Sequence, residues 1–432
     1  MLSLRASNLG RSLSALALSA LLAPHAVAGG AVWIVDASAG PGFHFIDIQT
    51  AIDVAQPNDR VFVRAGTYSG FVLNKPLIVR GTTGTRVINQ VIIQNIPAAT
   101  RCTLSRLEFF ELEVTGCAGG IVLEALKTRP FYADIGAPVR VQNSSDVRMH
   151  RCDFGSASLQ AACPDSGLNG TNVDSAALEI VSSMLRGQDA ETGFDYSCIG
   201  AGSGGVGLSA TFSTVSIAHS DLRGGFGGYA TLGAGGIGGT AALFSTSRAR
   251  LTASTFVGGN GGWGETCLCG QAFGDGANGH GVRATSQSLV RHSGSTASGG
   301  NAGNCCPPGS SFAQSSNSQI MLASPARPTL ALVNSSAAGA VTLRVTGPAN
   351  TTARVWLGRT MVTPTPNTDV VGLLTNRARL QNLGAVPAAG QVDAFFTLPS
   401  SVDTGELVIA QADVLTSTGE LLYSNSVCFT RP

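Results

Sequence analysis

Apolar and polar residues alternate in many short segments along most of the chain. Near the start, Ile48, Ile52 and Ala55 recur at helical spacing after Asp47, which predicts a short helix with an aspartate cap. Strand-like alternation follows, divided by turn-forming Gly, Pro and Asn, at 61–63, 71–73, 77–79 and 91–93. The pattern predicts one short helix and then a long series of short strands.

A degenerate Ser-x-apolar-x-Gly-Gly pattern recurs along the middle of the chain. It begins at Cys152, Ser183, Ser220, Ser254 and Ser295. In this register two apolar columns align, one of Val147, Leu178, Val215, Ala249 and Val290, the other of Met149, Ile180, Ile217, Leu251 and His292. The same spacing predicts that the columns extend one turn back through Leu112, Val114 and Cys117. Apolar columns with a period of two inside each unit predict stacked parallel strands.

Each repeat contains a Gly-rich crossover without helical periodicity, so we expect the chain to coil as a solenoid with turns about 4.8 Å apart. Gly-Gly at the strand exits is expected to supply the positive φ of a sharp corner. After about Arg327 the repeats stop, and alternating segments at 341–345, 353–357 and 407–411 predict a separate β-sandwich.

The charge of the chain and its N-terminal segment indicate where the protein is located. Only 12% of the 432 residues are charged, and the net charge of +1 gives no whole-chain argument for nucleic acid or for acidic membranes. Residues 1–28 combine Arg5 and Arg11, an apolar run and Ala26-Val27-Ala28, which predicts a secretory signal. The apolar run is too short to span a bilayer. We therefore expect a soluble, exported protein at the cell surface, outside the cell or in the periplasm.

The opening of the mature chain contains Trp33–Asp36, Ile48–Ile52, Ala55–Val63 and Gly66–Tyr68. These segments resemble the N-terminal cap and first coil of right-handed parallel β-helix proteins of the pectin lyase-like group. The resemblance implies an all-β fold in which a helix plugs the coil. The expected organisation is a signal at 1–28, a β-helix at 29–325 and a small β-sandwich at 326–432. The group includes lyases, hydrolases, esterases, epimerases and non-enzymes, so the resemblance leaves the activity open.

Four residues are weak catalytic candidates. Gly279-His280-Gly281 matches a short signature of polygalacturonases, but Gly236-Ile237-Gly238 is expected at the matching place of the preceding crossover. Arg186 and Arg223 should stack on adjacent turns beside Asp221, as a lyase acting on an acidic glycan would need. Calcium enters only under that lyase alternative.

Carboxylate pairing for glycoside hydrolysis is poorly supported. Asp153 and Asp221 are expected in one column, two turns apart, with Met184 between them.

Two aromatic residues are candidates for glycan binding. Tyr229 and Trp263 occupy equivalent positions after Gly-Gly-x-Gly-Gly on adjacent turns, where they could stack on sugar rings. A calcium-binding repeat would place an aspartate there, so we expect no metal.

The ten cysteines are an even number in an oxidising compartment, which favours disulfides. Cys117 and Cys152 are expected to share a column and bridge, whereas Cys102 and Cys428 have no assigned partner. We expect crossover loops of neighbouring turns to be cross-linked through Cys163, Cys198, Cys267, Cys269, Cys305 and Cys306. His292, in the last apolar column, is expected to cap the coil against the sandwich.

Together these features predict a disulfide-stapled, exported protein with a non-catalytic structural or glycan-contacting role. A polysaccharide-active enzyme, a lyase before a hydrolase, is the alternative, and an adhesin or assembly module is the third. The sequence does not identify the glycan or the oligomeric state.

Overall fold

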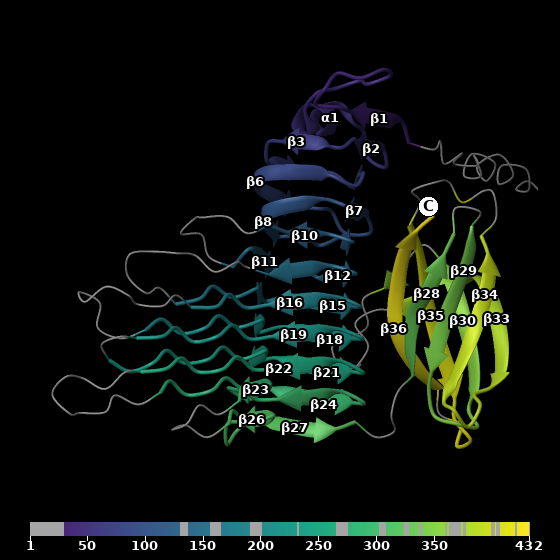
Figure 1. Cartoon of the computed structure of the whole chain (residues 1–432). Helices are drawn as coiled ribbons and strands as arrows, with labels where there is room; N and C mark the ends of the chain where they lie inside the picture. Colours follow the sequence, from purple (N-terminus) through teal and green to yellow (C-terminus); the bar gives the residue numbers. More distant parts are fainter. Residues whose placement is uncertain are drawn as a thin grey trace, which may run out of the picture.

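The fold is all-β, with long parallel sheets wound as a β-helix-like solenoid and an antiparallel, sandwich-like part beside it (Figure 1). The predicted signal lies outside the residues that the computed structural model describes. The described residues are 30–129, 137–155, 166–190, 201–230, 233–264, 275–301, 308–323, 328–336, 339–358, 361–362, 373–374, 377–398, 402, 407–419 and 421–431.

Helix α1 (Ile48–Val54) lies near the start of the solenoid. The Asp47 carboxylate accepts a hydrogen bond from the Thr50 N–H at 3.0 Å, which satisfies one of the free donors of the first turn. Ile48, Ala51 and Ile52 are buried and belong to the solenoid core. The helix therefore packs its apolar face against the first turns.

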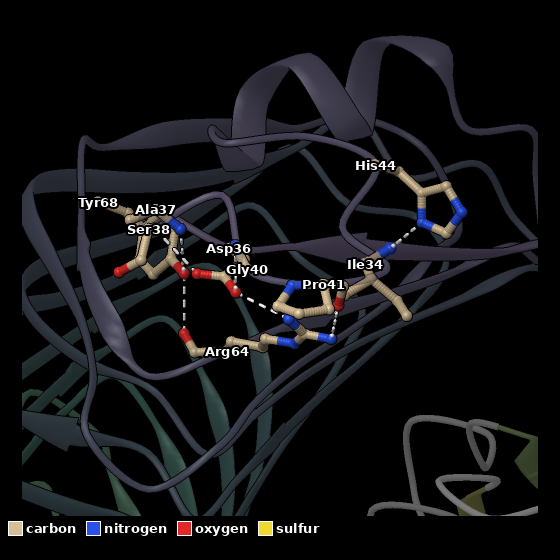
Figure 2. A network of polar contacts seen from close by, with 9 residues as sticks. All are labelled: Ile34, Asp36, Ala37, Ser38, Gly40, Pro41, His44, Arg64 and Tyr68. Atoms are coloured by element: carbon tan, nitrogen blue, oxygen red, sulfur yellow. Dashed lines mark hydrogen bonds and ion pairs between the residues drawn. The ribbon is translucent and has the colours of Figure 1, made fainter.

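The loop after the first strand is fixed by a polar network (Figure 2). The Asp36 carboxylate accepts hydrogen bonds from the Ser38 and Gly40 N–H groups and from the Arg64 guanidinium. Tyr68 donates its hydroxyl to the Arg64 carbonyl oxygen. Arg64 holds the pKa of Asp36 below its usual value. All of these contacts are internal, so the network is structural.

One face of the solenoid is an entirely parallel sheet with one strand from each turn. Its order is β1 (Val32–Val35), β2 (Arg60–Val63), β5 (Ile78–Gly81), β7 (Arg101–Ser105), β9 (Gly120–Glu124), β12 (Asp146–His150), β15 (Ala177–Val181), β18 (Thr214–Ala218), β21 (Arg248–Thr252), β24 (Leu289–Ser293) and β27 (Gln319–Leu322).

The other parallel sheet has two arms that meet at the long strand β8 (Glu108–Thr115). One arm contains β10 (Lys127–Thr128), β13 (Asp153–Gly155), β16 (Met184–Arg186), β19 (Asp221–Arg223), β22 (Thr255–Val257) and β25 (Thr296–Ser298). The second arm contains β11 (Val139–Gln142), β14 (Thr171–Asp174), β17 (Leu208–Thr211), β20 (Ala242–Ser245), β23 (Val282–Thr285) and β26 (Phe312–Gln314). Strand β6 (Thr85–Gln94) pairs with β8 and with β3 (Gly66–Tyr68) and β4 (Phe71–Leu73). A full turn thus contributes three strands.

The two predicted apolar columns are confirmed by strand register. Leu178 pairs with Val147 on one side and with Val215 on the other, and the column continues to Ala249 and Val290. The second column, from Met149 to His292, follows the same pairing. These residues form part of the buried core, except His292, which is half-buried.

Each turn has two tight corners, and each corner uses a residue with positive φ. Ser182, His219 and Ala253 occupy one corner of successive turns, with φ of 49°, 50° and 45°. The serine after each corner then links the turns. The Ser183 N–H donates to the Ser220 hydroxyl at 3.2 Å, and the Ser220 hydroxyl donates to the Ala218 carbonyl oxygen at 2.8 Å. This serine ladder explains the serine of the sequence repeat.

The other corner has its own serine ladder. The Ser213 N–H donates to the Ser247 hydroxyl at 3.0 Å, and the Ser247 N–H donates to the Ser288 hydroxyl at 3.1 Å. Hydroxyl groups thus satisfy buried backbone donors where the strand ladder is interrupted.

The predicted Cys117–Cys152 bridge is wrong, because the two residues lie at different corners. Leu112 and Val114 pair with Val139 and Val141, not with the column of Val147. The Cys117 N–H donates to Ser144, whereas the Cys152 N–H donates to Ser183 at the opposite corner. Both thiols are free and buried, as are Cys102 and Cys428. Burial raises the pKa of Cys152 to about 12, so this thiol is unreactive. The other six cysteines lie outside the described residues.

The C-terminal part contains antiparallel sheets around a second apolar core. One sheet has the order β28 (Thr329–Ser335), β29 (Ala340–Thr346) and β34 (Gln391–Thr397). A second has the order β33 (Arg377–Ala385), β30 (Thr352–Gly358), β35 (Leu407–Leu415) and β36 (Leu421–Thr430), and β31 (Met361–Val362) pairs with β32 (Leu373–Leu374).

Strand β36 contacts β9 and β15 on the outer face of the solenoid. Val122, Ile409 and Cys428 form a small buried cluster there, with Trp356 packed against it. Cys428, which the sequence left unassigned, is therefore an interface residue. His292 stacks on Phe312 in the last turns at 4.5 Å between ring centroids. The expectation that His292 caps the coil against the sandwich is wrong, because β27 covers the strand of His292 and the sandwich docks on β9 and β15.

Candidate functional site: an aromatic face on glycine-rich layers

The Gly-rich crossovers form two extended layers beside the solenoid (Figure 1). One layer contains the outgoing segments 187–190, 224–230 and 258–264, and the other contains the returning segments 201–207, 233–241 and 275–281. Gly224 and Gly227 donate to the carbonyl oxygens of Val257 and Asn260 on the next turn. Gly225 and Gly228 donate to Gly205 and Gly202 in the other layer.

Both sets of hydrogen bonds repeat every third residue. Three residues per turn is the period of the extended polyproline II conformation. The described parts of the crossovers are therefore ordered, hydrogen-bonded segments with that repeat.

Close backbone approach explains the glycines. A Cβ on Gly225 would lie 1.9 Å from the Gln188 carbonyl oxygen, and one on Gly239 would lie 2.0 Å from that of Gly205. Neither glycine has a left-handed φ. The expected role of Gly-Gly at a positive-φ corner is thus wrong, because serine, histidine and alanine form the corners and glycine allows the layers to touch.

Each three-residue repeat of the crossover, here called a triplet, has one position that need not be glycine. In the outgoing layer this position faces solvent. Arg223, Phe226 and Tyr229 follow one another at this spacing, and Phe226 is 53% exposed. On the next turn Trp263 is 62% exposed, and the Ala230 N–H donates to its carbonyl oxygen at 3.0 Å. Tyr229 and Trp263 are therefore neighbours, as predicted.

Polar side chains at the same positions tie the segments together. The Asp189 carboxylate accepts from the Phe226 N–H at 2.8 Å, and the Asn260 amide oxygen accepts from the Asn301 N–H at 2.7 Å. The exposed aromatic rings thus stand on a backbone that is held from both sides. We call the surface of Arg186, Arg223, Phe226, Tyr229 and Trp263 the aromatic face.

Arg186 and Arg223 pair across adjacent strands at one edge of this face. Arg223 forms an ion pair with Asp221 at 2.8 Å, and this hydrogen-bonded carboxylate raises the pKa of Arg223. Asp153 lies in the column of Asp221, two turns away, and contacts Lys127 at 3.6 Å. Each aspartate thus has its own cation, an arrangement typical of surface ion pairs.

His280 lies in the returning layer. Its Nδ1 accepts a hydrogen bond from the Ser310 N–H at 3.1 Å, and burial lowers the pKa of the imidazole. Strand register matches His280 with Thr240, because Val282 pairs with Ala242. The expected match with Ile237 is therefore displaced by one triplet. His280 thus occupies the non-glycine position of a triplet in the returning layer, and it is not part of the aromatic face.

Phe226 is the member of the face that the sequence argument missed. The signal was present in the three-residue spacing of Arg223, Phe226 and Tyr229. This period differs from the periods of strands and helices, so neither pattern singles out Phe226. Among the described residues, no three His, Cys, Asp or Glu side chains are grouped as metal ligands, and no helix has the length and apolar character needed to cross a bilayer.

No family model and no curated protein match this chain. Among solved structures, a DUF3823 family protein from Bacteroides ovatus is 17% identical, with a TM-score of 0.21. The alignment covers 27% of this chain and spans only 59% of the length of that protein. A likeness at this level carries no argument about function.

Proposed function

We propose that the protein is an exported, right-handed β-helix of the pectin lyase-like group, with α1 as its cap and a non-catalytic, glycan-contacting role. The observation that carries the proposal is the exposure of Phe226 and Trp263 on a hydrogen-bonded backbone. Large apolar rings cost free energy when they face water, and exposed apolar patches mark contact surfaces. The apolar faces of sugar rings match flat aromatic side chains in size and chemistry.

The arginine edge sets the expected glycan class. Arg186 and Arg223 stand on successive turns, about 4.8 Å apart along the stack. Guanidinium groups bind carboxylates through paired, charge-assisted hydrogen bonds. We therefore expect uronate- or sulfate-bearing glycans to bind more tightly than neutral ones at the aromatic face.

Titration calorimetry with acidic and neutral polysaccharides tests the proposal. Trp263→Ala and Phe226→Ala should each weaken binding by about tenfold or more. Phe395→Ala is the matched control, since Phe395 is 68% exposed but belongs to the sandwich. Unchanged affinity in both aromatic-face variants would remove this face from the proposed function.

The lyase alternative places Arg186 and Arg223 in a catalytic role on the same face. It is tested by ultraviolet absorbance of unsaturated products from acidic polysaccharides, with and without Ca²⁺. Turnover that Arg223→Ala abolishes would replace the non-catalytic proposal. If the face bound another protein instead of a glycan, the adhesin alternative would gain support. Export is tested by N-terminal sequencing of the secreted chain, with cleavage expected after Ala28.

A further inference from the structure

A groove runs along one corner of the solenoid, away from the glycine layers. It has a volume of about 600 Å³ and is open to solvent. The corner residues of four successive turns line it, namely Gly116, Asn143, Ser175 and Phe212. All four have positive φ, between 48° and 62°. Ala118, Ser145 and Ala177, each two residues after a corner, also line the groove. Their small side chains leave the space open.

Phe212 is unusual in this series. Its φ of 49° belongs to the left-handed region, where a bulky side chain is a conformational outlier, and its side chain is 64% exposed. The position therefore combines backbone strain with an aromatic ring in water. The neighbouring turns also have a positive-φ residue at this corner, Ser175 and Thr246, so the fold accounts for the backbone conformation. The fold does not require the exposed ring, and exposed apolar groups mark contact surfaces.

The rest of the groove supplies hydrogen-bonding groups without charge. The lining contains no Asp, Glu, Lys, Arg or His. In the described part of the chain, the side chains of Asn143 and Thr214 have no hydrogen-bond partner, so the amide and the hydroxyl are available to a ligand. The hollow is a shallow, open groove, and one exposed aromatic ring beside two free polar groups can contact one face of a ligand ring.

We propose that this corner groove binds a neutral saccharide, with one sugar ring on Phe212 and its hydroxyls on Asn143 and Thr214. The uncharged lining gives no partner to a carboxylate or a sulfate, which separates this ligand from the acidic glycan expected at the aromatic face. The inference does not depend on the proposed function, because it uses none of the same residues.

Phe212→Asn separates a ligand-binding role from a structural one. Asparagine tolerates positive φ and should relieve the strain, so the melting temperature should rise by about 2 °C. The same change removes the ring, so binding should weaken by about tenfold or more. Thr246→Asn is the matched control: Thr246 has φ of 49° at the same corner of the next turn but does not line the groove. It should gain stability and keep binding.

The probes are neutral hexasaccharides of glucose, xylose, mannose or galactose, titrated into the full chain by calorimetry. At least one should bind, and Phe212→Asn and Asn143→Ala should both weaken it. The proposal is overturned if none binds at millimolar concentration, or if binding survives Phe212→Asn. Loss of the same binding in Trp263→Ala with retention in Phe212→Asn would also overturn it and would assign the ligand to the aromatic face.

Discussion

Glu179 on strand β15 accepts hydrogen bonds from both the backbone N–H and the hydroxyl of Ser426, 247 residues later in the chain. The carboxylate is buried, and beside it the guanidinium of Arg148 is 1% exposed and bonded to Asp146 at 2.8 Å. The carboxylates of Asp146 and Glu179 raise the pKa of Arg148 despite burial, which acts to lower it. A buried charge network therefore joins the sandwich to the solenoid.

Removing one member of this network should be strongly destabilising. Glu179→Ala leaves Arg148 with less negative charge and leaves the Ser426 N–H without its acceptor, so we expect a loss of about 3–5 kcal/mol in the free energy of unfolding. Chemical denaturation measures it. Asp221→Ala, which breaks an exposed ion pair, should lose only about 0–1 kcal/mol. Equal effects of the two variants would contradict the assignment.

The same interface should weaken in acid. The His150 Nδ1 accepts a hydrogen bond from the Cys428 N–H at 3.3 Å, so the imidazole must be neutral. Burial, together with the positive charges of Arg148 and Arg151, lowers the pKa of His150 to about 3. A lowered pKa means that the stabilisation is complete above about pH 6.5 and is lost as the pH falls towards 3.

His150→Gln isolates this contribution. Burial raises the pKa of Glu179, which gives the opposite pH dependence in the folded protein, so wild type and variant must be compared at each pH. Between pH 6.5 and 3 the wild type should lose a few kcal/mol more than the variant. His44→Gln is the control, because His44 lies in the exposed loop near the N-terminus. Parallel curves for wild type and His150→Gln would rule out this role.

The glycine layers should not tolerate a methyl group at their contact. In Gly225→Ala the new Cβ would meet the Gln188 carbonyl oxygen, and overpacking of this kind costs about 1–3 kcal/mol or more. Gly155→Ala is the matched control, since its nearest atom would be the Arg186 Cβ at 3.5 Å. Hydrogen exchange at 201–207 and 224–230 should accelerate only in the first variant. If both variants behave alike, close approach does not explain the glycines.

The serine ladder should distinguish alanine from cysteine. Ser220→Ala leaves the buried Ser183 N–H without its acceptor, and we expect a loss of about 1–3 kcal/mol. Ser220→Cys should lose less stability than Ser220→Ala. Cys152 occupies the equivalent position at the start of the same ladder, and its thiol contacts two carbonyl oxygens. Thermal denaturation of the two variants gives the order, and a more stable alanine variant would contradict the ladder.

The repeat register was predictable because it depends on local spacing. Columns such as Val147, Leu178 and Val215 need only a period of two inside a turn and small residues at the corners. The predicted continuation of the columns to Cys117 is wrong because the earlier turns differ in length. Apolar residues at the same spacing also occur on a neighbouring face of the solenoid.

Other features had no local signal. The contact of Glu179 with Ser426 joins two segments that look ordinary in sequence, and only tertiary packing brings them together. Part of the aromatic face could be predicted from the sequence, because Tyr229 and Trp263 occupy the same position in consecutive repeats. Predicting the exposure of Phe226 needs the three-residue period of the crossovers. Predicting the site at Phe212 needs the position of the corner, where φ is positive.

The serine ladders also affect how such a chain can change in length. Where consecutive turns have serine at a corner, as Ser213, Ser247 and Ser288 do, each turn presents to its neighbour the same hydroxyl; Ala176 interrupts the series on the preceding turn. A whole turn of this serine-bearing segment could therefore be duplicated or lost with the backbone donors of the corner still matched. Growth of the molecule is modular along this axis, whereas an extra turn among β9, β12 and β15 would separate the strands that contact the sandwich.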